Sequence, residues 1–196
     1  MRTIISLIIA MMLGTIGLAQ DVLEWNPKYK LQLSDFQSSA TQVGDVSFIQ
    51  MQNGAEMEFS FQMTNLEFVF RKNFNSYAKC TFHKNIAVIV ANDSASANNL
   101  LQFARFQYDL TELYTRKFRK ALFDEKGFFT KGNFYQPLFN RIHNELNVRI
   151  VEANKQCNMG ENSEQLASLH QEVLKELADY SDYCYHCKPV KRKKKR

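Results

Sequence analysis

Hydrophobic and polar residues alternate in the first half of the chain and follow a helical spacing in the second half. From residue 57 to 63, Met and Phe occupy every second position, with Glu, Ser and Gln between them. This period of two indicates a strand with one apolar face. The preceding Asn53-Gly54 is typical of a hairpin turn, so we expect a partner strand in residues 46–52. Residues 66–71 predict another strand, and the apolar run 86–90 predicts either a short strand or the start of a helix.

The helical spacing begins near residue 97, where apolar positions recur every three or four residues. The first helix is expected over residues 98–122, with Ser94 or Ser96 as its N-cap and Lys126-Gly127 at its end. Its predicted buried stripe consists of Phe103, Gln107, Leu110, Tyr114 and Phe118.

Two further helices are predicted towards the C-terminus. One covers residues 135–154, with Pro137 tolerated in its first turn, and the other begins at Ser163, which is a good capping residue. The predicted buried positions are Leu138, Ile142, Leu146 and Ile150 in the former, and Leu166, Leu169, Val173, Leu177 and Tyr180 in the latter. An N-terminal antiparallel sheet followed by about three helices defines an α+β domain.

The first nineteen residues have the features of a secretory signal peptide. Arg2 precedes an apolar run, and Gly17 and Ala19 place small residues at the −3 and −1 positions of a cleavage site. An uncleaved N-terminal anchor is the alternative reading of residues 1–19. We therefore expect an exported protein, periplasmic or secreted, with a single domain in residues 20–187.

The formal net charge of +5 comes from the ends of the chain. Loss of Arg2 with the signal peptide leaves +4, and loss of the seven basic residues in 188–196 leaves −3 for the folded body. Residues 188–196 are therefore predicted to be a disordered basic tail on a mildly acidic domain. Export argues against a nucleic-acid partner, so the expected partner of the tail is an anionic envelope surface. A solvated tail without a partner is the alternative. The residues that would contact such a surface are Lys191, Arg192, Lys193, Lys194, Lys195 and Arg196.

The first predicted helix carries a family resemblance. Its sequence DLTELYTRKFRK, with LL ahead of it, resembles the helix of a bacterial family of secreted zinc-dependent proteases (domain of unknown function family 922). The bacterial members read approximately LL-x-HEQ-x-HFDITEL-x-ARKLRK. When residues 109–113 are set on DITEL, Phe103 falls at the first His, Ala104 at the Glu and Gln107 at the second His.

These replacements remove the chemistry that the resembled helix performs. In an H-E-x-x-H helix the two imidazoles bind zinc, and the Glu takes a proton from the zinc-bound water. Phe103 has no lone pair to donate, Gln107 offers a weak amide ligand, and Ala104 accepts no proton. A looser match of residues 156–162 to the third-ligand segment places Met159, a soft thioether, at the third His. The resemblance thus implies a zincin-like arrangement without its catalyst.

The cysteines leave three readings open. An even number of cysteines in an exported protein favours disulfides, so Cys184 or Cys187 is expected to bond Cys80 or Cys157, or the thiols are plain core residues. Alternatively, Cys80, His83, Cys184 and Cys187 have spacings that suit a zinc site. The third reading is a redox-active C-x-x-C pair at 184–187, although no thioredoxin-like pattern surrounds it.

The sequence therefore predicts an exported, non-catalytic, peptidase-like protein that binds an unknown protein or peptide and needs no cofactor. An active metallopeptidase would need a rearranged zinc site built from His83, His143 or the cysteines. An envelope protein that binds anionic lipid or lipopolysaccharide through its tail is the other alternative. His143 and His170 are interpreted as surface or boundary residues. Glu112 is expected to pair with Arg116 one helical turn later, and Asp109 to have a structural role.

Overall fold

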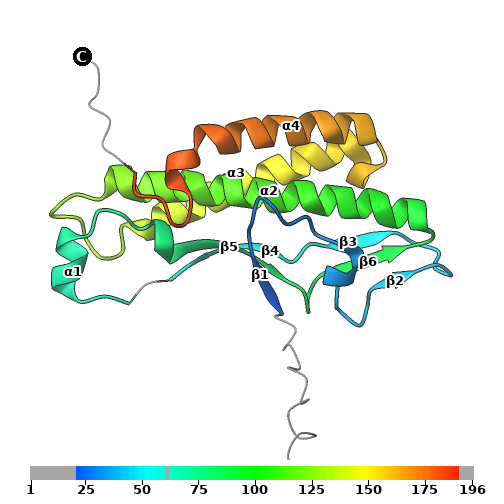
Figure 1. Cartoon of the computed structure of the whole chain (residues 1–196), viewed down its shortest axis with the longest axis horizontal. Helices are drawn as coiled ribbons and strands as arrows, with labels where there is room; N and C mark the ends of the chain where they lie inside the picture. Colours follow the sequence, from blue (N-terminus) through cyan, green and yellow to red (C-terminus); the bar gives the residue numbers. More distant parts are fainter. Residues whose placement is uncertain (1–20, 61, 190–196) are drawn as a thin grey trace, which may run out of the picture.

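The computed structural model describes residues 21–60 and 62–189, so the predicted signal peptide and most of the predicted basic tail lie outside the described residues. A long helix, α2 (Ser94–Glu125), runs between a layer of strands and two further helices, α3 (Tyr135–Cys157) and α4 (Ser163–Asp179) (Figure 1). The predicted α+β class and its three long helices are confirmed. No helix in these two segments is both long and apolar enough to cross a bilayer.

The strands form two small sheets that follow one another along α2 (Figure 1). The first sheet is antiparallel throughout, whereas in the second β2 runs parallel to β6. The prediction of one antiparallel sheet is therefore too simple. In spatial order the first sheet contains β1 (Val22–Glu24), β5 (Ala78–His83) and β4 (Ala55–Phe59), and the second contains β2 (Gln42–Val43), β6 (Val88–Ala91) and β3 (Gln50–Gln52).

The predicted hairpin at Asn53-Gly54 is wrong, because β3 and β4 do not pair with each other. The chain passes through Asn53 and Gly54 from the second sheet into the first, and β3 pairs with β6 while β4 pairs with β5. Between the two sheets, residues 53–54 lie opposite residues 83–87. Because the second of these segments is longer, the paired strands bend between the sheets. A Cβ on Gly54 would lie 2.4 Å from the carbonyl oxygen of His83. Glycine is required here by this close approach, not by a turn with positive φ.

The predicted strand at residues 66–71 is a helix, α1 (Asn65–Phe70). Its N-terminus has a capping box, in which the Thr64 hydroxyl accepts from the amide of Glu67 at 3.2 Å and the Glu67 carboxylate accepts from the amide of Thr64 at 2.9 Å. Besides the helices α1 to α4, the described residues contain single 3-10 turns: η3 (Leu33–Asp35), η4 (Asn75–Tyr77), η5 (Asn158–Gly160) and η6 (Ser181–Tyr183).

Helix α2 is covered on nearly every side. Nineteen of its 32 residues are buried, as expected for a helix of about 48 Å that packs on both sheets and on both other long helices. The predicted stripe from Phe103 to Phe118 is buried as expected. The N-cap is Asp93, whose carboxylate accepts from the amide of Ser96 at 2.7 Å, and not Ser94 or Ser96 as predicted.

The connection from α3 to α4 presses against α2. Helix α3 extends to Cys157, beyond its predicted end, and Asn162 caps α4 instead of Ser163. Asn158, Met159 and Gly160 then adopt positive φ in succession. A Cβ on Gly160 would lie 2.4 Å from a carbonyl oxygen of α2, so this turn brings Met159 onto the core beside α2.

Candidate functional site

The four positions matched to the ligands and base of a zinc peptidase lie together and are filled by packed side chains. Phe103, Ala104 and Gln107 are each at most 7% exposed. The amide oxygen of Gln107 accepts a hydrogen bond of 2.6 Å from Asn53. Met159 packs against both hydrophobic clusters, one containing Phe103 and the other Ala104. This part of α2 is core, and the one polar side chain among the three, Gln107, is hydrogen-bonded to Asn53.

The cysteines pair differently from the expected link to the body of the domain. Cys184 and Cys187 form a disulfide with each other, whereas Cys80 and Cys157 are buried free thiols. Burial raises the pKa of both thiols, and that of Cys80 well above the ordinary cysteine value. The alternative zinc site is not assembled in this structure, because two of its sulfurs are bonded together and His83 faces the opposite side of β5 from Cys80.

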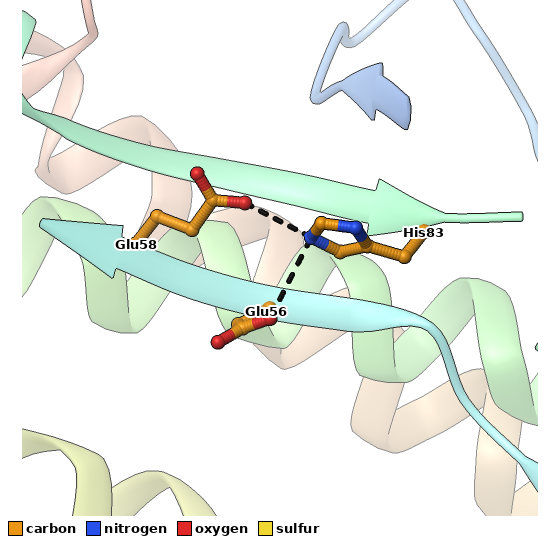
Figure 2. A group of neighbouring side chains, drawn as sticks. All are labelled: Glu56, Glu58 and His83. Atoms are coloured by element: carbon orange, nitrogen blue, oxygen red, sulfur yellow. Dashed lines mark hydrogen bonds and ion pairs between the residues drawn. The ribbon is translucent and has the colours of Figure 1, made fainter. Parts of the chain in front are cut away.

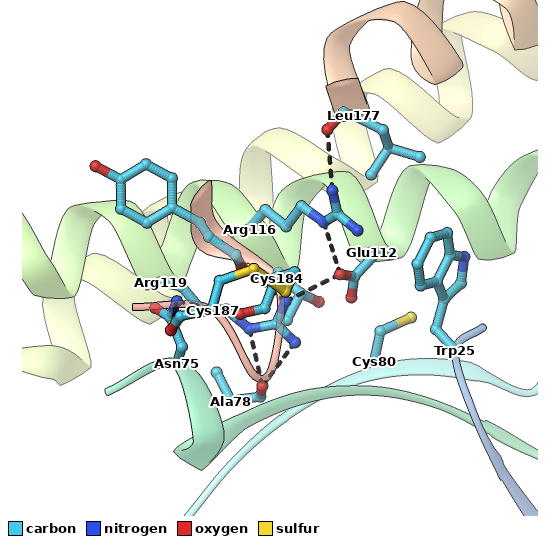
Figure 3. Close-up of polar contacts among 12 residues, drawn as sticks. Trp25, Asn75, Ala78, Cys80, Glu112, Arg116, Arg119, Leu177, Cys184 and Cys187 are labelled. Carbon is cyan, nitrogen blue, oxygen red and sulfur yellow. Dashed lines mark hydrogen bonds and ion pairs between the residues drawn. A yellow bond between two sulfur atoms is a disulfide. The ribbon is translucent and has the colours of Figure 1, made fainter. Parts of the chain in front are cut away.

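A buried ionic network links the centre of α2 to its surroundings (Figure 3). The predicted Glu112–Arg116 pair is present at 2.8 Å, and the same carboxylate oxygen also accepts from Arg119 at 2.9 Å. Buried charges need such partners, because an unpaired charge in a protein interior is strongly unfavourable. Other N–H groups of the two guanidiniums donate to the carbonyl oxygens of Ala78, Leu177 and Tyr183. The network therefore fastens β5, α4 and η6 to α2.

Two cavities open beside this network, and Trp25 lines both of them. A smaller one of about 270 Å³ lies against Cys80, Cys184 and Glu112. A larger one of about 600 Å³ lies between residues 25–31, α2 and α4. The larger volume is within the range typical of small-molecule and cofactor sites, and we call this space the α2–α4 cavity. Its apolar wall is made by Trp25, Pro27, Leu31, Tyr108, Leu174 and Leu177, and its polar groups include Lys30, Arg105, Asp109, Arg116, His170 and Gln171.

Asp109 organises the polar side of the α2–α4 cavity. One carboxylate oxygen accepts from the indole N–H of Trp25 at 2.7 Å, and the other lies 2.7 Å from Nε2 of His170. The Arg116 guanidinium lies over the Trp25 ring, 5.2 Å from its centroid, in cation–π geometry. The interpretation of His170 as an ordinary boundary residue is thus incomplete. Asp109 is structural as expected, and it also lines the cavity.

The cavity has an excess of positive charge. Its lining contains the cationic side chains of Lys30, Arg105 and Arg116 and the single carboxylate of Asp109. Arg116 shares Glu112 with Arg119, so its charge is only partly balanced within the network. The Nε of Arg105 donates to the carbonyl of Leu31 at 2.8 Å, which fixes the guanidinium at the wall. Such a lining suits a ligand with an anionic group and an apolar body.

The Asp109–His170 pair has the form of a carboxylate that orients an imidazole, but it lacks a nucleophile. In residues 21–60 and 62–189, no Ser, Thr or Cys side chain hydrogen-bonds His170. The nearby Tyr108 hydroxyl donates to the carbonyl of Leu23 at 3.2 Å, and burial raises its pKa above that of a free tyrosine. Asp109 thus orients the His170 imidazole at the wall of the α2–α4 cavity.

One other group of described side chains has the spacing of metal ligands. It consists of Glu56, Glu58 and His83 on β4 and β5. Neither glutamate was expected from the sequence, although the alternation of polar and apolar residues from 57 to 63 does place every second side chain on one face.

Comparison of the chain with protein-family models, curated proteins and solved structures finds no match. The site is therefore defined by its own geometry. The protein is an α+β domain with a central helix, α2, that is buried on nearly every side. A cavity of ligand size, with cationic and aromatic residues in its lining, lies beside this helix. The resemblance to zinc-dependent proteases stays a prediction that rests on the α2 sequence.

Proposed function

We propose that the protein is an exported, non-catalytic relative of zinc-dependent peptidases that binds a peptide in the α2–α4 cavity. The observation that supports this proposal is the burial of Phe103, Ala104 and Gln107 among core side chains, at the positions where the resemblance would put a catalytic centre. In this proposal α2 serves as a scaffold, and binding takes place on another face of the same helix, at Arg105, Asp109 and Arg116.

The charges of the cavity favour a peptide with a free carboxylate beside an apolar side chain. Arg105 and Lys30 supply the cations, and the aromatic face of Trp25 supplies apolar contact area. Hydrogen bonds to charged groups contribute about 1.5–3 kcal/mol each, which corresponds to roughly 10–100-fold in affinity.

Peptide binding can be measured through the fluorescence of Trp25, because it is the only tryptophan in the chain and it lines the cavity. We expect its fluorescence to change saturably when tripeptides ending in Phe or Leu with a free carboxylate are added. The same tripeptides with a C-terminal amide should bind at least about ten-fold more weakly. Arg105→Gln should weaken binding of the free acids to a similar degree. The matched control is Arg141→Gln, an exposed arginine on α3 paired with Glu145.

Equal binding of acids and amides, or no fluorescence response to either, would contradict a carboxylate-binding site. A separate assay addresses catalysis. The purified untagged protein is incubated with the same tripeptides, and products are followed by mass spectrometry with and without a chelator. Cleavage that is lost on chelation and restored by zinc would refute the non-catalytic proposal and favour a rearranged metallopeptidase.

A second candidate function is attachment to an anionic membrane, and an exposed aromatic patch favours it. Between 59% and 93% of each side chain in this patch is exposed, and two of its ring pairs lie 5.2 and 6.1 Å apart. Pro189, where the described chain ends, lines a shallow cavity with Arg71 and Asn73, directly after α1. The basic tail therefore leaves the domain near this patch, which consists of Leu66, Phe70, Phe128 and Phe129.

Aromatic residues that enter the headgroup region and a basic segment that attracts anionic lipid form a two-part anchor. We expect co-sedimentation with phosphatidylglycerol vesicles and none with phosphatidylcholine vesicles. Phe128→Ser with Phe129→Ser should reduce binding several-fold at all salt concentrations. Deletion of residues 190–196 should remove its salt dependence. Phe48→Ser, at an exposed phenylalanine outside the patch, is the control. Vesicle binding that is indifferent to both changes would exclude this function.

A further inference from the structure

Glu56, Glu58 and His83 project from the outer face of the first sheet (Figure 2). Glu56 and Glu58 flank Met57, which is buried against the core, so both carboxylates lie on the opposite face. Glu56 pairs with Thr81 in the β4–β5 register, and His83 follows Thr81 by two residues on the same face of β5. Adjacent strands thus hold the three side chains in place, and no flexible loop is involved.

The two carboxylates converge on a single imidazole nitrogen. Nε2 of His83 lies 2.9 Å from Oε1 of Glu58 and 3.5 Å from Oε2 of Glu56. A tetrahedral zinc ion with ligands at 2.0–2.1 Å separates its ligand atoms by about 3.3–3.4 Å. The two distances to Nε2 lie on either side of this value, and the ligand atoms of all three residues lie within 4.8 Å of one another, so an ion could be bound after adjustment of the side chains.

Hydrogen bonds within the protein serve the two carboxylates unequally. A ring nitrogen carries at most one proton, so Nε2 can donate a well-aligned hydrogen bond to only one of the two carboxylates. In the parts of the chain that the structure describes, neither Glu56 nor Glu58 forms an ion pair with a lysine or arginine. Lys79, opposite Glu58 in the register, pairs with Glu24 on β1 instead. A divalent cation would satisfy both carboxylates and the imidazole at once.

Thr81 supports the group from beneath. Its side chain is buried, and its hydroxyl donates to Oε1 of Glu58 at 2.6 Å. Hydrogen bonds of this kind, made to a metal-binding carboxylate by a neighbouring side chain, fix the orientation of the ligand. Thr81 therefore reduces the freedom that Glu58 would lose on binding an ion.

We propose that Glu56, Glu58 and His83 form a binding site for a divalent first-row transition metal ion, with zinc as the representative. One imidazole and two carboxylates suit zinc or manganese better than calcium, which prefers oxygen ligands alone. Three protein ligands on an exposed face leave coordination positions for water or for a ligand atom of a partner. The site is separate from α2 and does not depend on the proposed peptide binding.

Calorimetric titration of the purified untagged protein with zinc chloride tests the proposal, and cobalt absorption reports the ligand set. We expect one zinc ion per chain. His83→Gln should abolish binding, and Glu58→Gln and Glu56→Gln should each weaken it ten-fold or more. The matched controls are His143→Gln, on the exposed face of α3, and His170→Gln in the α2–α4 cavity.

Glu56 is exposed, so its variant keeps the test informative even if His83→Gln is unstable. Thermal melting of each variant establishes that it is folded. Absence of zinc binding in the unaltered protein would overturn the proposal. So would binding that survives His83→Gln, or binding that is lost in His170→Gln instead.

Discussion

At the scale of single residues, glycine has two roles that the sequence does not distinguish. Asn-Gly is a strong signal for a turn with positive φ, yet at Gly54 the requirement is space. The missing side chain lets the backbone of β4 approach His83. The amide of His83 donates to the carbonyl of Gly54 at 2.8 Å, and this bond fixes the approach. A local sequence pattern contains no information about a strand that arrives thirty residues later.

We predict that Gly54→Ala destabilises the protein by about 1–3 kcal/mol, as overpacking of a tight site does. The matched control is Gly132→Ala, where an added Cβ meets nothing within 4 Å and φ is not positive. That substitution should be neutral or stabilise by up to about 1 kcal/mol, because it restricts the unfolded chain. Urea denaturation of both variants measures the difference. Equal stability of the two variants would show that the backbone near Gly54 and His83 moves apart to accommodate the added methyl group.

At the scale of elements, the long helices were predictable and the short ones were not. The stripe of α2 repeats over many turns, so the spacing defines the helix and its buried face despite errors of a few residues at the ends. Helix α1 has only six residues, too few for a period to emerge, and its apolar residues suggested a strand. The informative signal was the Thr64-x-x-Glu67 capping box, which lies ahead of the apolar residues.

The pairing of α4 with its neighbours makes stability depend on pH. Glu176 lies 3.0 Å from Lys117 of α2 and 2.6 Å from Arg149 of α3. Desolvation raises the pKa of Glu176, but the hydrogen bonds and charges of Arg149 and Lys117 outweigh it, so the pKa is lowered below the ordinary value of 4.5. A lowered folded-state pKa stabilises the fold fully above the unfolded value and progressively less as the pH falls through the folded value.

We therefore predict that Glu176→Gln lowers the free energy of unfolding by about 1 kcal/mol at pH 7, as expected for half-exposed ion pairs. The difference between variant and parent should shrink as the pH falls below about 4.5. Glu145→Gln, at an exposed pair with Arg141, is the control and should change stability by less than about 0.5 kcal/mol. Denaturant titrations at pH 7, 5 and 3 provide the measurement. A difference between variant and parent that is independent of pH would refute the assignment.

At the scale of the whole molecule, the α2–α4 cavity could not be predicted from sequence patterns. Trp25 and His170 lie 84 and 61 residues from Asp109, the group that joins them, so only the packed fold makes them neighbours. Burial of Phe103 and Gln107 was predictable, since it follows from helical spacing alone. The cysteine pairing was not, because sequence spacing allows several connectivities and the geometry of the C-terminal turn selects one.

The position of α2 in the middle of the chain has a consequence for the order in which the protein folds. Its strand partners precede it in the sequence, whereas α3, α4 and η6 follow it. When the chain is synthesised from its N-terminus, α2 therefore appears before α3, α4 and η6. The apolar side chains of α2 that these elements cover are exposed during that time. Contacts of such long sequence separation form late and slow the search for the native state. Folding is expected to finish only once the residues around Tyr183 are available to bond Arg119. Until then the exposed helix is a natural target for chaperones.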